Sequence, residues 1–451
     1  MRTLAVLLLL VSLAALPRVT LASNDLALVG GTLIDGTGHP PITDAALLIR
    51  DGNILWVGKA RDARIPKEVR KINTTGMTVL PGLIDGHVHF STAGHNDYAR
   101  WEREFPESRV KEQIMPASAK ALLAAGVTTA RDLGGDLEDL LWLRDAERRG
   151  ELPAPHMLIA GPLLLTPHRK FSGSIQDPGK YWIIHDPEEG RAKVRELAQR
   201  KVDAIKIWDD EFTQDEFTAL ISEAHAHRLP VAAHLLTLEG IQKAVAGGMA
   251  EGDSLEHIGA GPGSAYPEDL VRTIAAHRIC VSPTLIAFEG VRQIAQDPHI
   301  LDDGKRRSML PPLIYQNILD SFRGFDPKSS PIYTYVYDYA PGRAAKLRQL
   351  RAAGALFVLG TDSGSRGNPH YKSAAREMVL LHQEVGLTNM EVIESATRIA
   401  AQALRLAART GTLEPGKTAD VAVVKGNPLE NLTAMEHVAY VVKSGALVEL
   451  H

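Results

Sequence analysis

Two histidines separated by one residue, His87 and His89, end the apolar run at 79–84 and are the first candidates for chemistry in this sequence. Because alternate side chains of an extended strand point to the same face, both imidazoles can approach one metal ion while Val88 points into the packing. A hydrolytic metal centre also needs further nitrogen or oxygen ligands and an open position for water. The pair therefore predicts a metal site only if other strand ends supply more ligands.

Further candidate ligands stand in or at the ends of four later apolar runs. They are Lys206 within 204–208, His234 in 231–235, His257 in 254–258 and Asp362 after 356–361. A single histidine is often a hydrogen-bonded structural residue, and a single lysine is often a solvent-facing charge. Six such side chains at five strand ends favour a metal centre over six separate structural roles.

The apolar runs that carry these residues alternate with segments of helical periodicity, which predicts a parallel sheet with crossover helices. The candidate strands are 78–84, 126–133, 156–164, 204–208, 231–235, 254–258, 280–286 and 356–361, and the candidate helices include 191–201, 214–227 and 238–246. Eight parallel strands close a barrel in which functional groups gather at the carboxyl ends of the strands. We therefore predict the α/β class and a (β/α)8 TIM barrel.

Short apolar runs broken by turn residues lie on both sides of this region. The runs are 26–36, 45–49 and 54–58 near the start, and 419–424, 438–442 and 446–448 near the end. Asp-Gly turns between short strands favour an antiparallel sheet. We expect residues 23–80 and 409–451 to form one small β-sandwich domain, and residues 81–408 to form the barrel domain.

Residues 1–22 differ from the rest of the chain. Arg2 precedes the apolar run 4–16, and Pro17 and small residues up to Ser23 follow, which predicts a secretory signal peptide. An uncleaved membrane anchor is the alternative, although the run is short for a spanning helix. Cys280 is the only cysteine, so the chain can form no internal disulfide. We expect a secreted or periplasmic protein without a stable membrane span after signal removal.

The composition is that of an ordinary globular protein. Of 451 residues, 45% are hydrophobic and 23% are charged, and the formal net charge is −4. No run of Lys and Arg forms the basic surface that a nucleic-acid-binding protein usually has. We expect a small-molecule substrate as the partner and no nucleic acid, and a homo-oligomer is compatible with the sequence.

The stretch 287–341 is long for a loop between two barrel strands and is rich in tyrosine. Long insertions in compact domains are commonly lids or binding loops. Its tyrosines could stack on an aromatic or peptide-like substrate. Alternatively, they could pack the insertion onto the barrel or onto a neighbouring subunit.

Several motifs occur in the order in which the amidohydrolase superfamily of metal-dependent hydrolases has them. They are PGLIDGHVH at 81–89, GVTTARD at 126–132, AIKI at 204–207, His234, Glu256 with His257, GTDSG at 360–364 and GTLEPGKTAD at 411–420. The chain most resembles the branch that holds imidazolonepropionase-like proteins, Xaa-Pro dipeptidases and ochratoxin-type amidases. The resemblance covers nearly the whole mature chain and implies a barrel with a β-sandwich and two zinc ions.

The resemblance also implies a role for each ligand. One zinc ion would be held by His87, His89 and Asp362, and the other by His234 and His257. Lys206 would be carbamylated and would bridge the two ions together with a hydroxide, because a carbamate offers two anionic oxygens where an ammonium offers no lone pair. Asp362 would take the proton of the attacking water and pass it to the leaving amine.

Candidates for substrate contact are fewer. By the same resemblance His168 contacts a substrate oxygen and takes part in catalysis, and Arg169 beside it would attract a carboxylate. The alternative for this segment is a solvated basic loop. Arg366 and His370, shortly after Asp362, are further substrate-binding candidates. The dipeptidase-like members carry a tyrosine where this chain has Leu236, which puts plain dipeptide specificity in question.

Together these features predict a binuclear zinc amidohydrolase that cleaves an amide or peptide bond in a small carboxylate-bearing substrate, such as a dipeptide or an N-acyl amino acid. The same metal centre could instead act on a lactone, cyclic amide, carbamate or organophosphate ester. A non-catalytic binding protein is the third alternative. Asp132 is expected to support the metal ligands rather than to react.

Overall fold

The computed structural model describes residues 25–167, 179–330 and 332–449. The predicted signal peptide, 1–22, and the candidates His168 and Arg169 lie outside the described residues. Within those ranges, every helix is too short or too polar to cross a bilayer.

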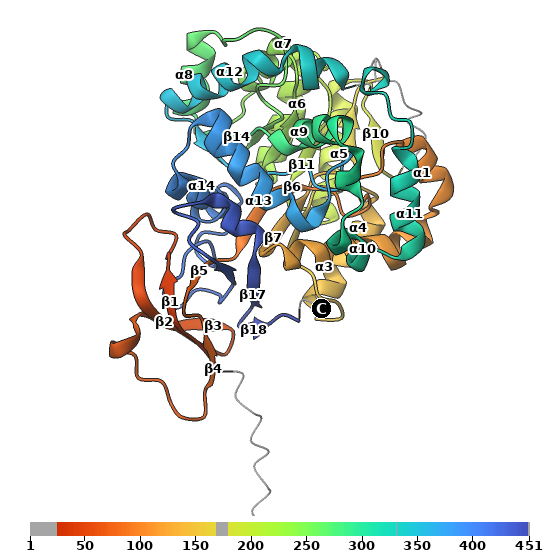
Figure 1. Ribbon diagram of the computed structural model, residues 1–451. Helices are drawn as coiled ribbons and strands as arrows, with labels where there is room; N and C mark the ends of the chain where they lie inside the picture. Colours follow the sequence, from red (N-terminus) through yellow and green to blue (C-terminus); the bar gives the residue numbers. More distant parts are fainter. Residues whose placement is uncertain (1–24, 168–178, 331, 450–451) are drawn as a thin grey trace, which may run out of the picture.

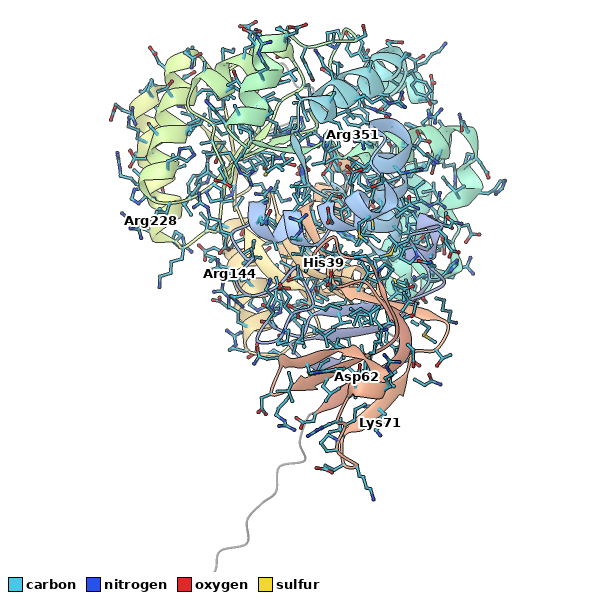
Figure 2. The ribbon with its side chains drawn as sticks, turned by 90° about the vertical axis from the view of Figure 1, so that its left-hand side faces the viewer. His39, Asp62, Lys71, Arg144, Arg228 and Arg351 are labelled. Atoms are coloured by element: carbon cyan, nitrogen blue, oxygen red, sulfur yellow. The ribbon has the colours of Figure 1, made fainter. Side chains whose placement is uncertain are left out.

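The two ends of the chain meet in one eight-stranded sheet at one end of the molecule (Figure 1). Its strands are β1 (Leu26–Leu33), β2 (Ile42–Arg50), β3 (Asn53–Lys59), β4 (Arg70–Asn73), β5 (Met77–Pro81), β16 (Val421–Lys425), β17 (Val438–Lys443) and β18 (Ala446–Leu447). Their order is β18-β17-β16-β5-β1-β2-β3, with β4 paired to β1. Figure 2 shows Asp62 and Lys71 at this end and Arg351 on the helical part of the molecule.

The pairing within this sheet is partly as expected. Strands β1, β2 and β3 form antiparallel pairs. The expectation of a purely antiparallel sheet is wrong, because β1 pairs in parallel with β4 and β5. After β3, residues 60–69 carry the chain back across the sheet. The next strand, β4, therefore runs beside β1 in the same direction. Val79 and Val423, from opposite ends of the sequence, lie in one buried core. Burial of each side chain stabilises the fold by about 1.5–3 kcal/mol.

The middle of the chain forms two parallel sheets. The three-stranded sheet contains β6 (Leu83–Val88), β7 (Val127–Asp132) and β8 (His156–Ile159). The seven-stranded sheet contains, in spatial order, β10 (Tyr181–Ile183), β9 (Leu163–Leu165), β11 (Ile205–Ile207), β12 (Val231–His234), β13 (Ser254–Glu256), β14 (Cys280–Ser282) and β15 (Leu356–Phe357). Most of these strands are buried along their whole length, as parallel strands covered by helices are.

Hydrogen bonds join the two parallel sheets at both edges of the three-stranded sheet. Beyond β15, Gly86 N donates to Leu359 O at 2.8 Å and His89 N donates to Ser363 O at 2.9 Å. On the other side, Asp203 N donates to Ile159 O at 2.7 Å. The first of these connections places the segment after β15 directly beside the end of β6.

Helices cover the outside of the parallel strands (Figure 1). They are α1 (Tyr98–Glu104), α2 (Glu107–Arg109), α3 (Met115–Ala124), α4 (Leu137–Arg148), α5 (Pro187–Gln199), α6 (Gln214–Ala226), α7 (Leu238–Ala246), α8 (Glu268–Ala276), α9 (Leu285–Gln296), α10 (Gly304–Met309), α11 (Pro312–Ser321), α12 (Ala340–Ala352), α13 (His370–Leu380), α14 (Asn389–Ser395) and α15 (Arg398–Ala403). Short helical segments are η1 (Ala60–Asp62), η2 (Val110–Ile114), η3 (Pro298–Leu301), η4 (Pro327–Ser329), η5 (Thr334–Asp338), η6 (Leu381–Val385) and η7 (Leu432–Glu436). The predicted helices 191–201, 214–227 and 238–246 are confirmed as α5, α6 and α7.

Four predicted strands have the wrong extent, and one of them, 356–361, is a strand only at Leu356–Phe357. The run 78–84 is divided between β5 and β6 at Gly82, where a Cβ atom would lie only 2.1 Å from Thr128 Oγ1. The run 156–164 is divided between β8 and β9 by Gly161, whose φ of 78° no extended strand has. The run 280–286 ends as a strand at Ser282, because Thr284 adopts a φ of 49° and α9 begins one residue later.

The insertion 287–341 is not one irregular loop. Most of this stretch is helical, from α9 through α11 to η5. Tyr335 and Tyr337 pack against the buried cluster that contains Phe288 and Val336, and the rings of Tyr333 and Tyr337 stack with centroids 4.7 Å apart. These tyrosines therefore pack onto the protein itself, as one of the two alternatives expected.

Candidate metal centre

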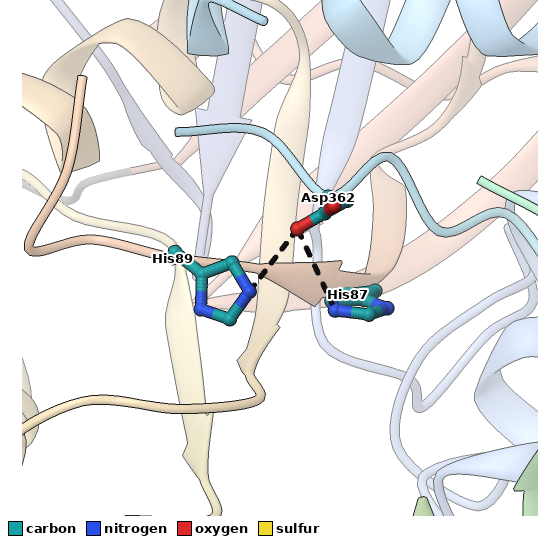
Figure 3. A group of neighbouring side chains, drawn as sticks. All are labelled: His87, His89 and Asp362. Atoms are coloured by element: carbon teal, nitrogen blue, oxygen red, sulfur yellow. Dashed lines mark ion pairs between the residues drawn. The ribbon is translucent and has the colours of Figure 1, made fainter. Parts of the chain in front are cut away.

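Asp362 lies against both histidines of the opening motif (Figure 3). Its Oδ1 atom is 3.1 Å from His89 Nε2 and 3.7 Å from His87 Nε2. The potential ligand atoms of the three residues all lie within 4.8 Å of one another. The histidines end β6 and the aspartate follows β15, so the hydrogen bonds between these two segments create this corner of the site.

His234 and His257 extend the cluster from the neighbouring strands β12 and β13. Their ring centroids are 4.1 Å apart, and the ring of His257 lies 5.0 Å from that of His87. His257 therefore lies between the His87 corner and His234. The structure brings all four predicted histidine ligands into one continuous group.

Lys206 projects from β11 and is almost completely buried, with 1% of its surface exposed. Its Nζ atom has no hydrogen-bond partner. Burial lowers the pKa of Lys206 to about 8, although the negative charges of Glu256 and Asp362 act to raise it. A buried amine without a partner is rare in native proteins. This buried position excludes a solvent-facing charge. It fits a lysine whose amine becomes covalently modified.

A buried carboxylate orients His87. Glu256 Oε2 lies 2.9 Å from His87 Nδ1, and Glu256 Oε1 is 3.1 Å from an Nη2 atom of Arg131. Arg131 Nε donates in turn to Gly86 O at 2.8 Å, next to His87 in the chain. With Nδ1 bonded to the carboxylate, Nε2 of His87 is left to face Asp362.

His89 is oriented by a backbone carbonyl. Its Nδ1 atom lies 3.0 Å from Gly134 O, which can only accept a hydrogen bond, so Nδ1 carries the proton. Asp132 fixes this arrangement, because its carboxylate accepts from Phe90 N at 2.8 Å and from Gly134 N at 2.9 Å. Asp132 thus has the supporting position that its sequence context suggested.

A threonine hydroxyl orients His257. Thr284 Oγ1 lies 2.6 Å from His257 Nδ1 and donates its own proton to Pro283 O at 2.8 Å. The hydroxyl therefore accepts from Nδ1, and Nε2 of His257 is left with its lone pair. Three histidines, each held through Nδ1, present Nε2 as a metal ligand does.

The protonation states suit metal binding. Burial lowers the pKa of His257 to about 4 and that of His87 well below its usual value, so both rings are neutral at pH 7. Burial would raise the pKa of Asp362, but the hydrogen bond to His89 holds it well below its usual value. Burial would lower the pKa of His89, but its hydrogen bond to Asp362 raises it above the usual value. The site therefore presents two neutral imidazoles, those of His87 and His257, together with His89 and one carboxylate, and imidazole and carboxylate are donor types that zinc and related ions take.

Three non-glycine residues at the site adopt left-handed backbone conformations. The φ angles are 62° for His257, 49° for Thr284 and 55° for Asp362. Such conformations cost about 1–3 kcal/mol each and persist where the surroundings hold them. At Asp362 the holding group is Asn368, whose Nδ2 atom donates to Thr361 O at 2.7 Å and to Asp362 O at 2.9 Å.

The remaining substrate candidates within the described ranges contact the protein. Arg366 Nε donates to Asn96 O at 2.6 Å, and its guanidinium lies 5.3 Å from the ring centre of Tyr98. His370 is buried, with Nε2 3.0 Å from His89 O. The structure thus places His370 behind the ligand strand, where it supports the backbone of His89. Both residues stay predictions as substrate contacts.

Sequence reasoning missed several residues that hold the ligands, among them Thr284 and Asn368. No spacing signal marks them, because they act from turns whose course only the fold determines. Glu256 belongs to one of the motifs, together with His257, but the motif alone indicated no role for it. Its charge within a fully buried strand, directly before His257, is a signal that could have revealed it.

The fold and the site define an enzyme class. A family model described as "Amidohydrolase family" matches residues 78–448. The chain therefore belongs to the amidohydrolase family, and it is an enzyme of that family.

Known proteins similar over nearly the whole chain agree with this assignment. Ochratoxinase from Aspergillus niger is 27% identical, and the match covers 95% of this chain and 88% of that protein. An imidazolonepropionase from Rhizorhabdus wittichii is also 27% identical, over 86% of this chain and 90% of its own length.

Solved structures show the same fold. The crystal structure of a Xaa-Pro dipeptidase with bound methionine has a TM-score of 0.76 at 24% identity and covers 94% of this chain and 100% of its own. That of a putative prolidase from Bifidobacterium longum has a TM-score of 0.70 at 27% identity and covers 94% of both chains.

Proposed function

We propose that this protein is a binuclear zinc amidohydrolase that cleaves an amide or peptide bond in a small carboxylate-bearing substrate, such as a dipeptide or an N-acyl amino acid. The observation that carries the proposal is the buried, unpartnered Nζ of Lys206 within a group of oriented histidines and a carboxylate. Neither a structural core nor a solvent-exposed charge cluster accounts for that combination.

The six residues divide into ligands and a bridge. His87, His89 and Asp362 would hold one ion, and His234 and His257 the other. The neutral amine of Lys206 would add to the carbon of carbon dioxide and lose one proton, which gives a carbamate with one negative charge and two oxygens for the two ions. Two divalent ions, when bound, supply an activated water and polarise the scissile carbonyl.

Asp362 would move the proton. Its carboxylate is ionised, and its Oδ1 atom lies 3.1 Å from His89 Nε2, so the other oxygen can accept a proton from the attacking water. The same proton then passes to the leaving nitrogen as the carbon–nitrogen bond breaks, because an unprotonated amide nitrogen leaves poorly. Asn368 keeps the aspartate in the strained conformation that this position requires.

The substrate class is supported by the similarity to the named relatives and by the cation Arg366 four residues beyond Asp362.

We include in the proposal that the two parallel sheets are parts of one closed (β/α)8 barrel, which the hydrogen bonds between the two sheets support. A secreted or periplasmic location is likewise proposed, on the apolar N-terminal run alone.

The test is a substrate screen of the zinc-loaded mature chain with N-acyl amino acids, Xaa-Pro and other dipeptides, lactones and aryl esters. We expect amide hydrolysis with a preference for substrates that have a free carboxylate, and Asp362→Asn should lower kcat/KM by about 10²–10⁴-fold. Asp215→Asn, an exposed position on α6, is the matched control. Undiminished amide hydrolysis by Asp362→Asn, or turnover confined to lactones and esters, would contradict the proposal.

A further inference from the structure

Trp208 lies at the carboxyl end of β11, one residue beyond the last position of that strand. Its backbone N donates to Leu164 O at 2.8 Å, so the pairing of β11 with β9 continues through this residue. Because alternate side chains of an extended chain point to the same face, Trp208 shares the face of Lys206. The indole therefore lies in the next layer of side chains beyond the metal-ligand group.

The indole ring of Trp208 lies directly beside one candidate metal ligand. Its centroid is 5.8 Å from that of the His234 ring, and the two rings are nearly perpendicular at 82°. The ring of Tyr181 lies 5.7 Å from the indole at an interplanar angle of 23°, so these two side chains are stacked. Trp208, Tyr181 and His234 are each partly exposed. The stacked pair therefore forms an aromatic wall beside His234.

Apolar side chains also flank the other histidine of this pair. The ring of Phe288 lies 6.2 Å from that of His257 at an interplanar angle of 89°. Leu236, two residues beyond His234, is partly exposed and packs against the buried cluster that contains Phe288. Leu236 stands where the dipeptidase-like members have a tyrosine, so this chain has an apolar surface in place of a hydroxyl. The side of the centre formed by His234 and His257 is therefore largely apolar.

The surroundings of Asp362 are different, because a cation lies there. The guanidinium of Arg366 lies 5.3 Å from the ring centre of Tyr98, and Arg366 N donates to the hydroxyl of Tyr98 at 3.0 Å. Three strands, β12, β13 and β14, separate β11 from β15 in the sheet, so Trp208 and Arg366 lie on different sides of the metal-ligand group. A substrate that spans the site meets a cation at one end and the aromatic wall at the other.

We propose that Trp208 is a specificity-determining residue, which selects substrates that have a bulky apolar group on the acyl side of the scissile bond. The inference rests on the proposed function, in which the substrate carboxylate lies on the side of Arg366. In an N-acyl amino acid the carboxylate belongs to the amino-acid half, so the acyl group is the part that reaches Trp208. Contact with the indole removes the apolar surface of that group from water and favours its binding.

Calorimetric titration of the metal-loaded mature enzyme with two ketone acids, 4-oxo-4-phenylbutanoate and 4-oxopentanoate, tests the role of Trp208. These acids have a CH2 group where N-benzoylglycine and N-acetylglycine have the amide NH, so they cannot be hydrolysed. The wild type should bind the phenyl ketone about tenfold more tightly than the methyl ketone. Trp208→Ala should reduce this preference to less than about threefold and leave the affinity for 4-oxopentanoate unchanged. Trp56→Ala, on β3 of the eight-stranded sheet, is the matched control and should keep the wild-type preference.

Several binding results would overturn the proposal. Equal affinity of the wild type for the two ketones would do so, as would an unchanged preference in Trp208→Ala. An equal loss of affinity for both ketones in that variant would show that Trp208 has only a structural role. If Trp208→Ala does not fold by circular dichroism, Trp208→Leu should lower the preference about threefold, because leucine offers less apolar surface. An unchanged preference in Trp208→Leu then overturns the proposal.

Turnover distinguishes this inference from the proposed function. If no amide in the substrate screen is hydrolysed but the preference for the phenyl ketone is intact, the proposed function is contradicted and the role of Trp208 is supported. If N-benzoylglycine and N-acetylglycine are hydrolysed with equal kcat/KM, the role of Trp208 is contradicted and the proposed function stands.

Discussion

Glu256 Oε2 lies 2.9 Å from Nδ1 of His87, with both side chains fully buried. The two residues are 169 positions apart in the sequence, and only the pairing of β13 within the parallel strands brings the carboxylate next to His87. The contact fixes which nitrogen of His87 is available for a metal and increases the electron density on it.

The first prediction concerns this contact. Glu256→Gln keeps an acceptor for His87 Nδ1 but removes the charge that also pairs with Arg131, so metal affinity and activity should fall by about 10–100-fold. Competition with a chelator measures the affinity, and kcat/KM measures the activity. Glu239→Gln, on the exposed face of α7, is the control. Wild-type metal affinity in Glu256→Gln would show that the contact is only structural.

The second prediction concerns Thr284. Thr284→Val removes the hydroxyl that accepts from His257 Nδ1 and leaves that buried donor without a partner, at a cost of about 1–3 kcal/mol. We expect loss of metal, mainly one of two ions, and a lower kcat. Thr284→Ser keeps the hydroxyl and should behave like the wild type when metal content is measured by mass spectrometry. Equal metal content in the two variants would refute the role of the hydroxyl.

The third prediction is a pH dependence of stability away from the site. His225 Nε2 lies 2.9 Å from Asp253 Oδ2, and this hydrogen bond, against the effect of burial, raises the pKa of His225 above its ordinary value of 6.5. The charged pair therefore stabilises the fold fully below pH 6.5, and the contribution is lost as the pH rises through the raised pKa. Because His225 is one-third exposed, we expect no more than about 1 kcal/mol.

The measurement for His225 is urea unfolding of His225→Gln and the wild type at pH 5.5 and at pH 9. The variant should be less stable at the lower pH and nearly equal at the higher one. His277→Gln, at an exposed helix end, should show no such difference between the two pH values. A stability loss in His225→Gln that is the same at both pH values would contradict the electrostatic explanation.

The fourth prediction concerns Glu377, which is buried and accepts from the backbone N atoms of Leu285 and Ile286 at 2.9 and 2.7 Å. It caps the start of α9 directly after Thr284. Glu377→Ala leaves two buried donors without partners, so it should lower the free energy of unfolding by about 2–4 kcal/mol. Thermal unfolding measures this, with Glu268→Ala on the exposed face of α8 as the comparison; equal midpoints for the two variants would be contrary to expectation.

The ligand-bearing strand ends were predictable from the sequence because local patterns determine them. The apolar runs before His87, His234 and Asp362 mark buried strands, and parallel topology sends their carboxyl ends to one face. The HxH spacing of His87 and His89 then requires only that the strand be extended. Composition and periodicity sufficed for this part.

What the sequence did not reveal depends on interactions between distant segments. The break at Gly82 follows from contact with Thr128, and the hydrogen bonds of Thr284 follow from a left-handed turn that has no sequence signature. The helices within 287–341 were hidden by prolines and tyrosines that resemble loop composition. Packing against Phe288 stabilises them, which is a tertiary effect.

The most direct test of the central claim is native mass spectrometry of the purified mature protein, beside the Lys206→Met variant. We expect two divalent metal ions per chain and one added carbon dioxide in the wild type, with both features lost in the variant. A wild-type chain that carries no carbon dioxide, or a variant that still holds two ions, would contradict the central claim.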